Sequence, residues 1–140
     1  MKNSILTISG VVGTFIAHYL GGWDTALQTL LIFMAVDYFT GLMMAGVFHQ
    51  SNKSKNGALE SKAGFKGLCR KGMALLIVLV GAQLDVMMNI DVVRNGVIIA
   101  FTVNETISII ENAGVMGVPI PDVLTNAIEV LQNKKQGGVQ

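Results

Sequence analysis

The chain alternates between long apolar stretches and short polar breaks, a pattern typical of membrane helices. Its four apolar segments are long enough, or nearly so, to cross a hydrocarbon core of about 30 Å. They comprise residues 5–20, 26–48, 73–90 and 92–110. Short turns at Gly21–Asp24 and Asn89–Asp91 join them in pairs. The pattern predicts an all-α integral membrane protein in which residues 1–140 form one domain of two transmembrane helical hairpins.

The fourth segment carries its polar residues on one side. At about 100° per residue, five side chains fall within an arc of roughly 120° on a helix. We call them the polar stripe: Asn104, Glu105, Ser108, Glu111 and Asn112. A charged side chain at the centre of a membrane helix costs about 2.5–3.5 kcal/mol on insertion scales. The stripe must therefore face neighbouring helices or a water-filled lumen, and the sequence leaves both open.

Basic residues gather between the two hairpins, in residues 49–72. The segment contains six basic residues and one acid, and its membrane-surface candidates are Lys62, Lys66, Arg70 and Lys71. The positive-inside rule places this loop in the cytoplasm. With four spans, Lys2 and the Lys134-Lys135 pair join it, so that nine of the ten basic residues are cytoplasmic. We therefore expect four spans and two cytoplasmic termini. Three spans are the alternative, and they would place one end outside.

Two segments outside the predicted spans are amphipathic. Residues 57–71 contain Phe65 and Leu68 among lysines. They fit either an amphipathic helix at the membrane interface or a solvated basic loop, and the basic residues favour contact with anionic lipid. Residues 121–133 repeat apolar side chains at helical spacing after two prolines. This repeat predicts a short amphipathic helix on the membrane surface or against a partner. The first span resembles a signal peptide, but it lacks a cleavage site of small residues, so we interpret it as retained.

Asp37 lies at the centre of the second span. A carboxylate there must face protein or carry a proton. It is either a hydrogen-bonded link between helices or a titrating group within an assembly, and it is a candidate partner for the polar stripe. Small residues repeat at four-residue spacing on two spans, which permits close packing within or between chains. They are Gly41 and Ala45 on the second span, and Gly13, Ala17 and Gly21 along the first.

Asp85 and Arg94 flank the second short turn. A hairpin centred between Asn89 and Ile90 brings them to one depth in the membrane. We expect the two side chains to pair, which would offset the cost of placing both charges there. In the alternative, Arg94 extends outward to the interface beside Asp91.

Composition excludes several other classes of protein. Charged residues make up 14% of the chain, against about 25% in a typical soluble domain. The single cysteine, Cys69, rules out an intrachain disulfide, and the two histidines lack metal-ligand spacing. The sequence contains neither a phosphate-binding loop nor a nucleophile–base pair. We therefore expect no metal, no cofactor and no enzymatic activity, and we expect the basic loop to contact anionic lipid rather than nucleic acid.

Several motifs occur in a characteristic order. Asp37-Tyr38-Phe39-Thr40-Gly41 lies in the second span, and Ser61-Lys62-x-Gly64-Phe65-Lys66-Gly67-Leu68-x-Arg70-Lys71 leads into the third. Asp85, Arg94, the polar stripe and Gly117-x-Pro119-x-Pro121 follow. Over residues 5–132, this series resembles the bacteriophage holin family, which also includes clostridial toxin-secretion holins.

The resemblance implies a non-catalytic protein of the bacterial inner membrane that forms homo-oligomers and permeabilises the membrane. An endolysin, or a toxin in some relatives, would escape through the lesion for timed lysis of the host cell. The endolysin is thus a functional partner that need not touch the holin. Two other classes also fit the chain: a small proton-coupled ion or solute transporter using Asp37 or Glu105, and a membrane scaffold that recruits cytoplasmic proteins.

Overall fold

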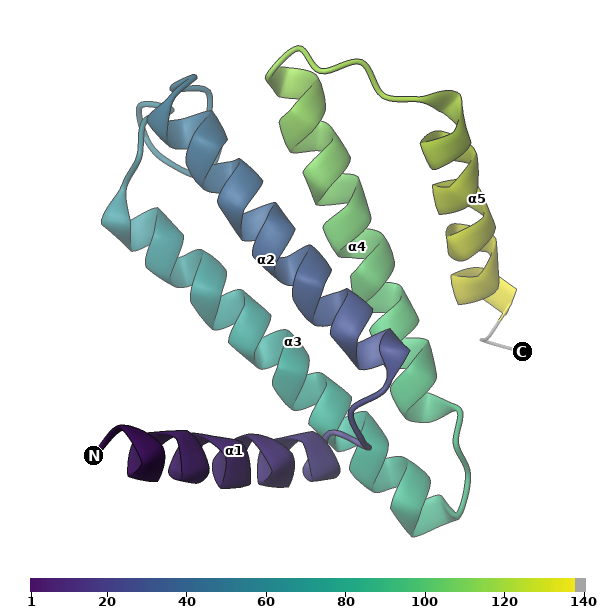
Figure 1. Ribbon diagram of the computed structural model, residues 1–140. Helices are drawn as coiled ribbons and strands as arrows, with labels where there is room; N and C mark the ends of the chain where they lie inside the picture. The colour runs from purple at the N-terminus through teal and green to yellow at the C-terminus, as the bar shows by residue number, and fades with distance from the viewer. Residues whose placement is uncertain (138–140) are drawn as a thin grey trace.

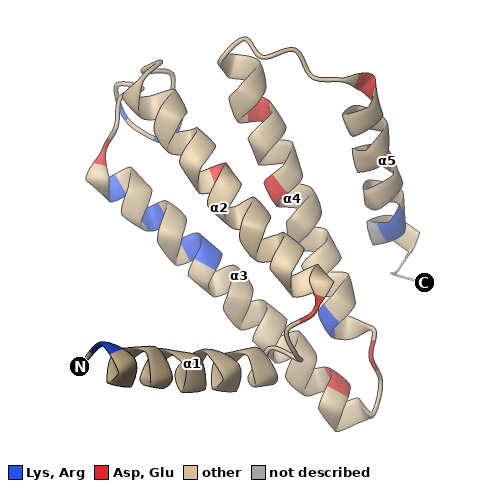
Figure 2. Ribbon diagram, in the orientation of Figure 1, with Lys and Arg blue, Asp and Glu red and all other residues tan. Residues whose placement is uncertain are grey.

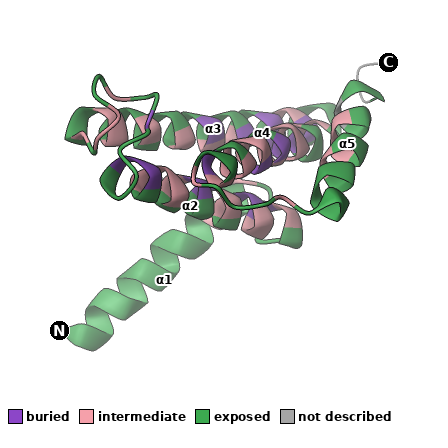
Figure 3. Cartoon of the chain, turned by 90° about the horizontal axis from the view of Figure 1, so that it is seen from above, coloured by how far each residue is buried: buried purple, intermediate pink, exposed green. Residues whose placement is uncertain are grey.

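The computed structural model describes residues 1–137, which form five helices and no strand (Figure 1). The prediction of an all-α protein is confirmed. Helices α2, α3 and α4 form the bundle, α5 lies beside α4, and α1 projects sideways from one end (Figures 1 and 3). The bounds are α1 (Lys2–Tyr19), α2 (Thr25–Gly46), α3 (Ser61–Met88), α4 (Val93–Val115) and α5 (Asp122–Gly137).

Three helices, α2, α3 and α4, have the length and apolar composition needed to cross a membrane. The prediction of four spans is not supported, and the three-span alternative fits. In α1, Lys2, Asn3 and Ser4 form the first turn and His18 and Tyr19 end the helix. The apolar part between them provides only about 20 Å at 1.5 Å per residue, which is short for a core of about 30 Å. Three spans would place the two ends on opposite faces, so two cytoplasmic termini are not supported either.

The spanning helices are aligned at the end where α4 begins. There, Arg94 of α4 contacts Asp24, the residue that caps α2, and Asp85 near the end of α3. From this level, α2 and α4, with 22 and 23 residues, extend for about 33–35 Å. The part of α3 from Asp85 back to Ser61 extends for about 36 Å from this level. The first turn of α3 therefore reaches beyond a core of about 30 Å at the opposite end.

The third helix begins twelve residues before the predicted span, at Ser61 instead of Met73. Lys62, Lys66, Arg70 and Lys71 are consequently helical residues and do not belong to a loop. Of the two interpretations of residues 57–71, the structure supports a helix for the part from Ser61 onward. The predicted span failed to include these turns because hydropathy treats each lysine as an isolated cost, whereas a helix can continue into the headgroup region.

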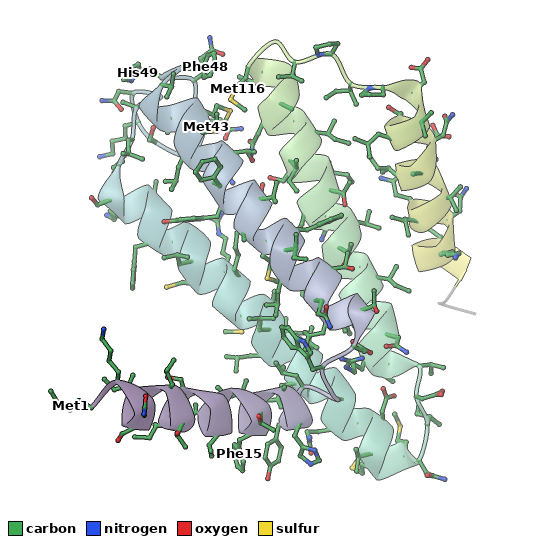
Figure 4. The ribbon with its side chains drawn as sticks, viewed as in Figure 1. Met1, Phe15, Met43, Phe48, His49 and Met116 are labelled. Carbon is green, nitrogen blue, oxygen red and sulfur yellow. The ribbon has the colours of Figure 1, made fainter. Side chains whose placement is uncertain are left out.

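The core of the bundle lies between the aligned end and its middle. It contains Leu27, Leu30 and Met34 of α2, Ala74 and Val78 of α3, and Ile98 of α4. Other large apolar residues of the same helices point outward, among them Ile32, Phe39, Leu76 and Val80. An exposed apolar surface of this extent is typical of a face covered by lipid. In contrast, α1 contains no buried residue, and Figure 4 shows its Phe15 directed away from the bundle.

Candidate functional site: two polar clusters among the spanning helices

The first polar cluster joins all three spanning helices. Lys71 of α3 donates from Nζ to Oδ2 of Asp37 on α2, at 2.7 Å, and to Oε2 of Glu105 on α4, at 2.5 Å. Asn112 of α4 donates from Nδ2 to Oδ1 of Asp37, at 3.3 Å, and to Oγ1 of Thr40, at 3.0 Å. We call these five residues the inner cluster. Every hydrogen bond of the inner cluster that connects two different helices joins two side chains.

The inner cluster is buried and lies deep in the bundle. The side chains of Asp37, Glu105 and Lys71 are 7%, 14% and 15% exposed. Measured along each helix from the aligned end, the three residues lie at about 17–21 Å, within a core of about 30 Å. Two carboxylates share one ammonium group, so the three charged residues carry one excess negative charge when all are ionised. Since isolated charges are costly in this environment, Lys71 is the group that makes the two acids tolerable.

The polar stripe divides between the inner cluster, a cavity and the surface. Glu105 and Asn112 belong to the inner cluster, and Asn112 is buried. Asn104 and Ser108, together with Glu105, line a cavity of about 300 Å³. Glu111 is exposed. In the single chain the stripe thus faces neighbouring helices and a cavity at the same time.

This cavity lies between α2, α3, α4 and the segment between α2 and α3. Asp37, Lys71 and Glu105 line it, together with Arg70 beside Lys71, and with Lys53 and Glu60 nearer the start of α3. Its lining therefore contains three acids and three bases. Figure 2 shows the basic residues along the first half of α3 and the acidic positions on the neighbouring α2 and α4.

The second polar cluster consists of Asp24, Asp85 and Arg94, and we call it the outer cluster. The guanidinium of Arg94 forms two hydrogen bonds with the carboxylate of Asp24, at 2.6 and 3.0 Å. It also donates to the backbone carbonyls of Leu20, at 2.5 Å, and Gly22, at 3.0 Å. Arg94 thereby fastens the turn after α1 and the start of α2 to α4.

Asp85 binds backbone and not the side chain of Arg94. Its two carboxylate oxygens accept from the amides of Val93 and Arg94, both at 2.9 Å. These amides open α4 and have no carbonyl of their own helix to bind, which makes them good partners for a carboxylate. The prediction that the side chains of Asp85 and Arg94 pair is therefore wrong. They do share one depth, but Asp85 caps the helix while Arg94 reaches across to α2.

Two local features depend on Arg94. Its hydrogen bonds hold the pKa of the Asp24 carboxyl below the usual value of 3.8. Gly21 has φ of +90°, and a Cβ atom there would lie 2.5 Å from Cδ and Nε of Arg94. Gly21 was predicted as part of a packing face. As a glycine it has no side chain to collide with Arg94, and it can adopt the left-handed backbone of this turn.

The remaining small residues lie in different surroundings. A Cβ atom on Gly41 would lie 3.9 Å from Nδ2 of Asn112, and Ala45 is buried, so this face of α2 is directed toward α4. Around Gly13 nothing lies within 4 Å of such an atom, and Ala17 is on the same helix, α1. Among the described residues, no group of histidine, cysteine and acidic side chains could hold a metal ion.

Lys71 is the residue that sequence reasoning placed wrongly. It was grouped with Lys62, Lys66 and Arg70, which are exposed on α3, whereas its own side chain turns into the bundle. A signal was available in the sequence, because two intramembrane acids on different spans require a cation. Lys71 is the basic residue closest to the start of the apolar part of the third span.

The profile of the bacteriophage holin family matches residues 14–133 of the chain. The chain belongs to this family. It is 39% identical to an uncharacterised 14.9 kDa protein encoded in the nagH 3′ region of Clostridium perfringens, over 96% of this chain and all of that protein. It is 29% identical to a probable holin of Bacillus phage phi105, over 82% of this chain and 80% of the phage protein. It is also 33% identical to an uncharacterised protein of Listeria monocytogenes, over 87% and 82% of the two chains.

No solved structure matches the chain. Family membership and the three apolar helices identify a membrane protein and support a holin-like role. The family is in general not enzymatic.

Proposed function

We propose that the protein is a holin that assembles with copies of itself in the bacterial cytoplasmic membrane and opens a lesion. A cell-wall hydrolase, or a toxin, leaves through that lesion. Family membership supports the role. The observation that carries the mechanism is the inner cluster, in which Lys71 holds two intramembrane acids of different helices.

The inner cluster favours a protein with two arrangements. In the single chain, Lys71 and Asn112 satisfy the acid on α2, and Lys71 satisfies the acid on α4. Separating the helices in lipid would expose these charges at high cost. Separating them around water would not, because water solvates the same groups. At a threshold density of copies, the polar stripe can therefore exchange neighbours within the chain for the hydrated lumen of an assembly.

The proposed orientation follows the basic residues. The segment between α2 and α3, which contains Lys53 and Lys55, lies at the end of the bundle opposite the outer cluster, and α5 follows the end of α4 there (Figure 2). The exposed basic residues of α3 continue from this end along the first half of the helix. The positive-inside rule assigns this end to the cytoplasm. The C-terminal helix is then cytoplasmic, and α1 lies at the outer face. A cysteine placed at Asp91 should react with a membrane-impermeant reagent from outside, and one at Asn133 should not.

The decisive experiment induces the gene with and without a muralytic enzyme in the cytoplasm. Abrupt lysis only when both are present supports a holin. Gradual, ion-selective leakage would support a transporter instead, and an unchanged permeability would support a scaffold.

A variant of the polar stripe tests the mechanism separately. We expect Glu105→Ala combined with Glu111→Ala to change the time of lysis, while the protein still enters the membrane. Unchanged timing would contradict the role of the stripe. The single variants divide the effect: Glu105 binds Lys71 and Glu111 is exposed, so Glu105→Ala should account for most of it.

A further inference from the structure

The cavity beside the inner cluster has an unusual lining for a space inside a membrane bundle. Three acidic and three basic side chains line it, and Asn104 and Ser108 add neutral polar groups. A cavity with charged and polar groups in its wall can hold water, whereas empty cavities are typically apolar. Its volume of about 300 Å³ is far above the roughly 10–15 Å³ that one water molecule requires.

A buried hydroxyl gives independent support for water. Among the described residues, Oγ of Ser54 is buried without a hydrogen-bond partner, and Ser54 lines the cavity. Buried hydroxyl groups are almost always hydrogen-bonded, to protein or to ordered water. A water molecule in the cavity would supply this partner.

The cavity has two different ends. At one end its lining belongs to the segment between α2 and α3, including the exposed residues Lys53 and Leu59. Toward the other end it reaches Ala74 and Phe101. Beyond them, the apolar core closes the bundle, with Leu27, Leu30 and Val78 fully buried. The outer cluster then lies on the far side of that core.

We infer that this cavity is a water-filled vestibule that opens at the end of the bundle formed by residues 50–60 and stops at the apolar core. The ligand of this site is water together with small hydrophilic solutes. The inference deepens the proposed function, since the inner half of a polar route then exists in each chain before any assembly. Only the outer half, sealed by the core, has to be opened when a lesion forms.

Cysteine accessibility tests the vestibule in membranes collected before lysis. In a Cys69→Ser background, Ser108→Cys and Ala63→Cys place a thiol on the cavity wall. Phe39→Cys is the matched control, because Phe39 lies at nearly the depth of Ser108 but is 62% exposed on an outward face. The reagent is a small, positively charged methanethiosulfonate, applied to inside-out vesicles and, separately, to spheroplasts. Full labelling after denaturation shows that each variant is present in equal amount.

Under the proposed orientation, we expect both cavity thiols to react in inside-out vesicles and not in spheroplasts. Ser108→Cys should react at least about tenfold faster than Phe39→Cys, because only a hydrated thiol ionises to the reactive thiolate. Equal rates for Ser108→Cys and Phe39→Cys would overturn the vestibule. Equal labelling of Ser108→Cys from both faces would overturn its closure by the apolar core. The measurement requires no lysis, so it can fail while the holin activity stands, and the reverse is equally possible.

Discussion

The inner and outer clusters use similar residues in different ways. In the outer cluster, Arg94 and Asp85 bind largely to backbone: two carbonyls of the turn before α2 and two amides that open α4. In the inner cluster, Lys71, Asp37 and Glu105 bind one another through side chains from three helices. Breaking these bonds leaves backbone groups of the turn before α2 and of the first turn of α4 without partners. Side-chain partners can separate while every helix stays intact.

This difference divides the bundle into a fixed end and a separable end. The outer cluster and the apolar core hold the helices where α4 begins. The inner cluster lies beside a cavity, where water can take over its hydrogen bonds once the helices move apart. We therefore expect opening to begin at the inner cluster, and each of the following variants tests that contrast.

The largest effect is expected from Lys71→Met. The variant leaves two carboxylates facing each other, and removing one partner of a buried ion pair typically costs about 3–5 kcal/mol. We expect early lysis and a lower unfolding temperature in detergent. Lys66→Met is the matched control, since Lys66 is an exposed basic residue of the same helix and does not line the cavity.

A charge-neutral variant sharpens this test. Asp37→Asn and Glu105→Gln, added to Lys71→Met, remove all three charges, and replacing a whole ion pair is often close to neutral. The triple variant should recover most of the stability lost in Lys71→Met. If it recovers none, the defect of Lys71→Met does not arise from unpaired charge.

Arg94→Met should act on the fixed end instead. Asp24 loses its partner and the carbonyls of Leu20 and Gly22 lose their donor. Because Asp24 is 48% exposed, we expect a loss of about 3 kcal/mol, the lower limit for a broken buried pair. The protein should accumulate poorly and unfold at lower temperature without early lysis. Early lysis by Arg94→Met would contradict the division of the bundle.

A smaller effect is expected from Gly21→Ala. Alanine at this position would have to adopt a left-handed backbone, and its methyl group would collide with Arg94. Together these effects cost about 1–3 kcal/mol. Gly10→Ala is matched to it, because Gly10 is helical and has open space around it. Alanine there should stabilise α1 by up to about 1 kcal/mol. Equal unfolding temperatures for the two variants in detergent would show that the turn is not fixed by Arg94.

The smallest expected effect is a loss of folding stability at acidic pH. The pKa of Asp24 is lower in the folded protein than its usual 3.8, so the ionised carboxylate favours folding. This stability is fully present above the usual pKa and is lost as the pH falls through the lowered value. We expect the difference in unfolding temperature between the protein and Asp24→Asn to narrow below about pH 4. A difference that is constant from pH 6 to pH 3 would contradict the ionised Asp24–Arg94 pair.

Much of the bundle could be predicted from the hydrophobic pattern. The turns near Gly21–Asp24 and Asn89–Asp91, and the helices on either side, follow from period and turn residues. The apolar length of the first segment overestimates it as a span, because polar residues stand at both ends of α1. The early start of α3 does not follow from hydropathy, because lysines ordinarily mark the end of a span.

The partners of the charged residues were harder to predict. The symmetry of the second hairpin gave the depth of Asp85 and Arg94 but not the direction of their side chains. A long arginine can reach a third helix, and free backbone amides at the start of α4 compete for Asp85. Similarly, that Asp37 needs a partner follows from its place in an apolar span. That the partner is Lys71 depends on how the three helices pack, which periodicity does not contain.

The most direct test of a separable inner cluster is a reversible lock between α2 and α4. In a Cys69→Ser background, Gly41→Cys and Asn112→Cys place two thiols across the interface, where a Cβ atom on Gly41 would lie 3.9 Å from Nδ2 of Asn112. A short, reducible thiol cross-linker joins them in vesicles that contain a trapped protein-sized dye, with each single-cysteine variant as control. We predict that the cross-linked protein retains the dye and that a reductant starts its release. Release from the cross-linked protein at the rate of the controls would contradict the account.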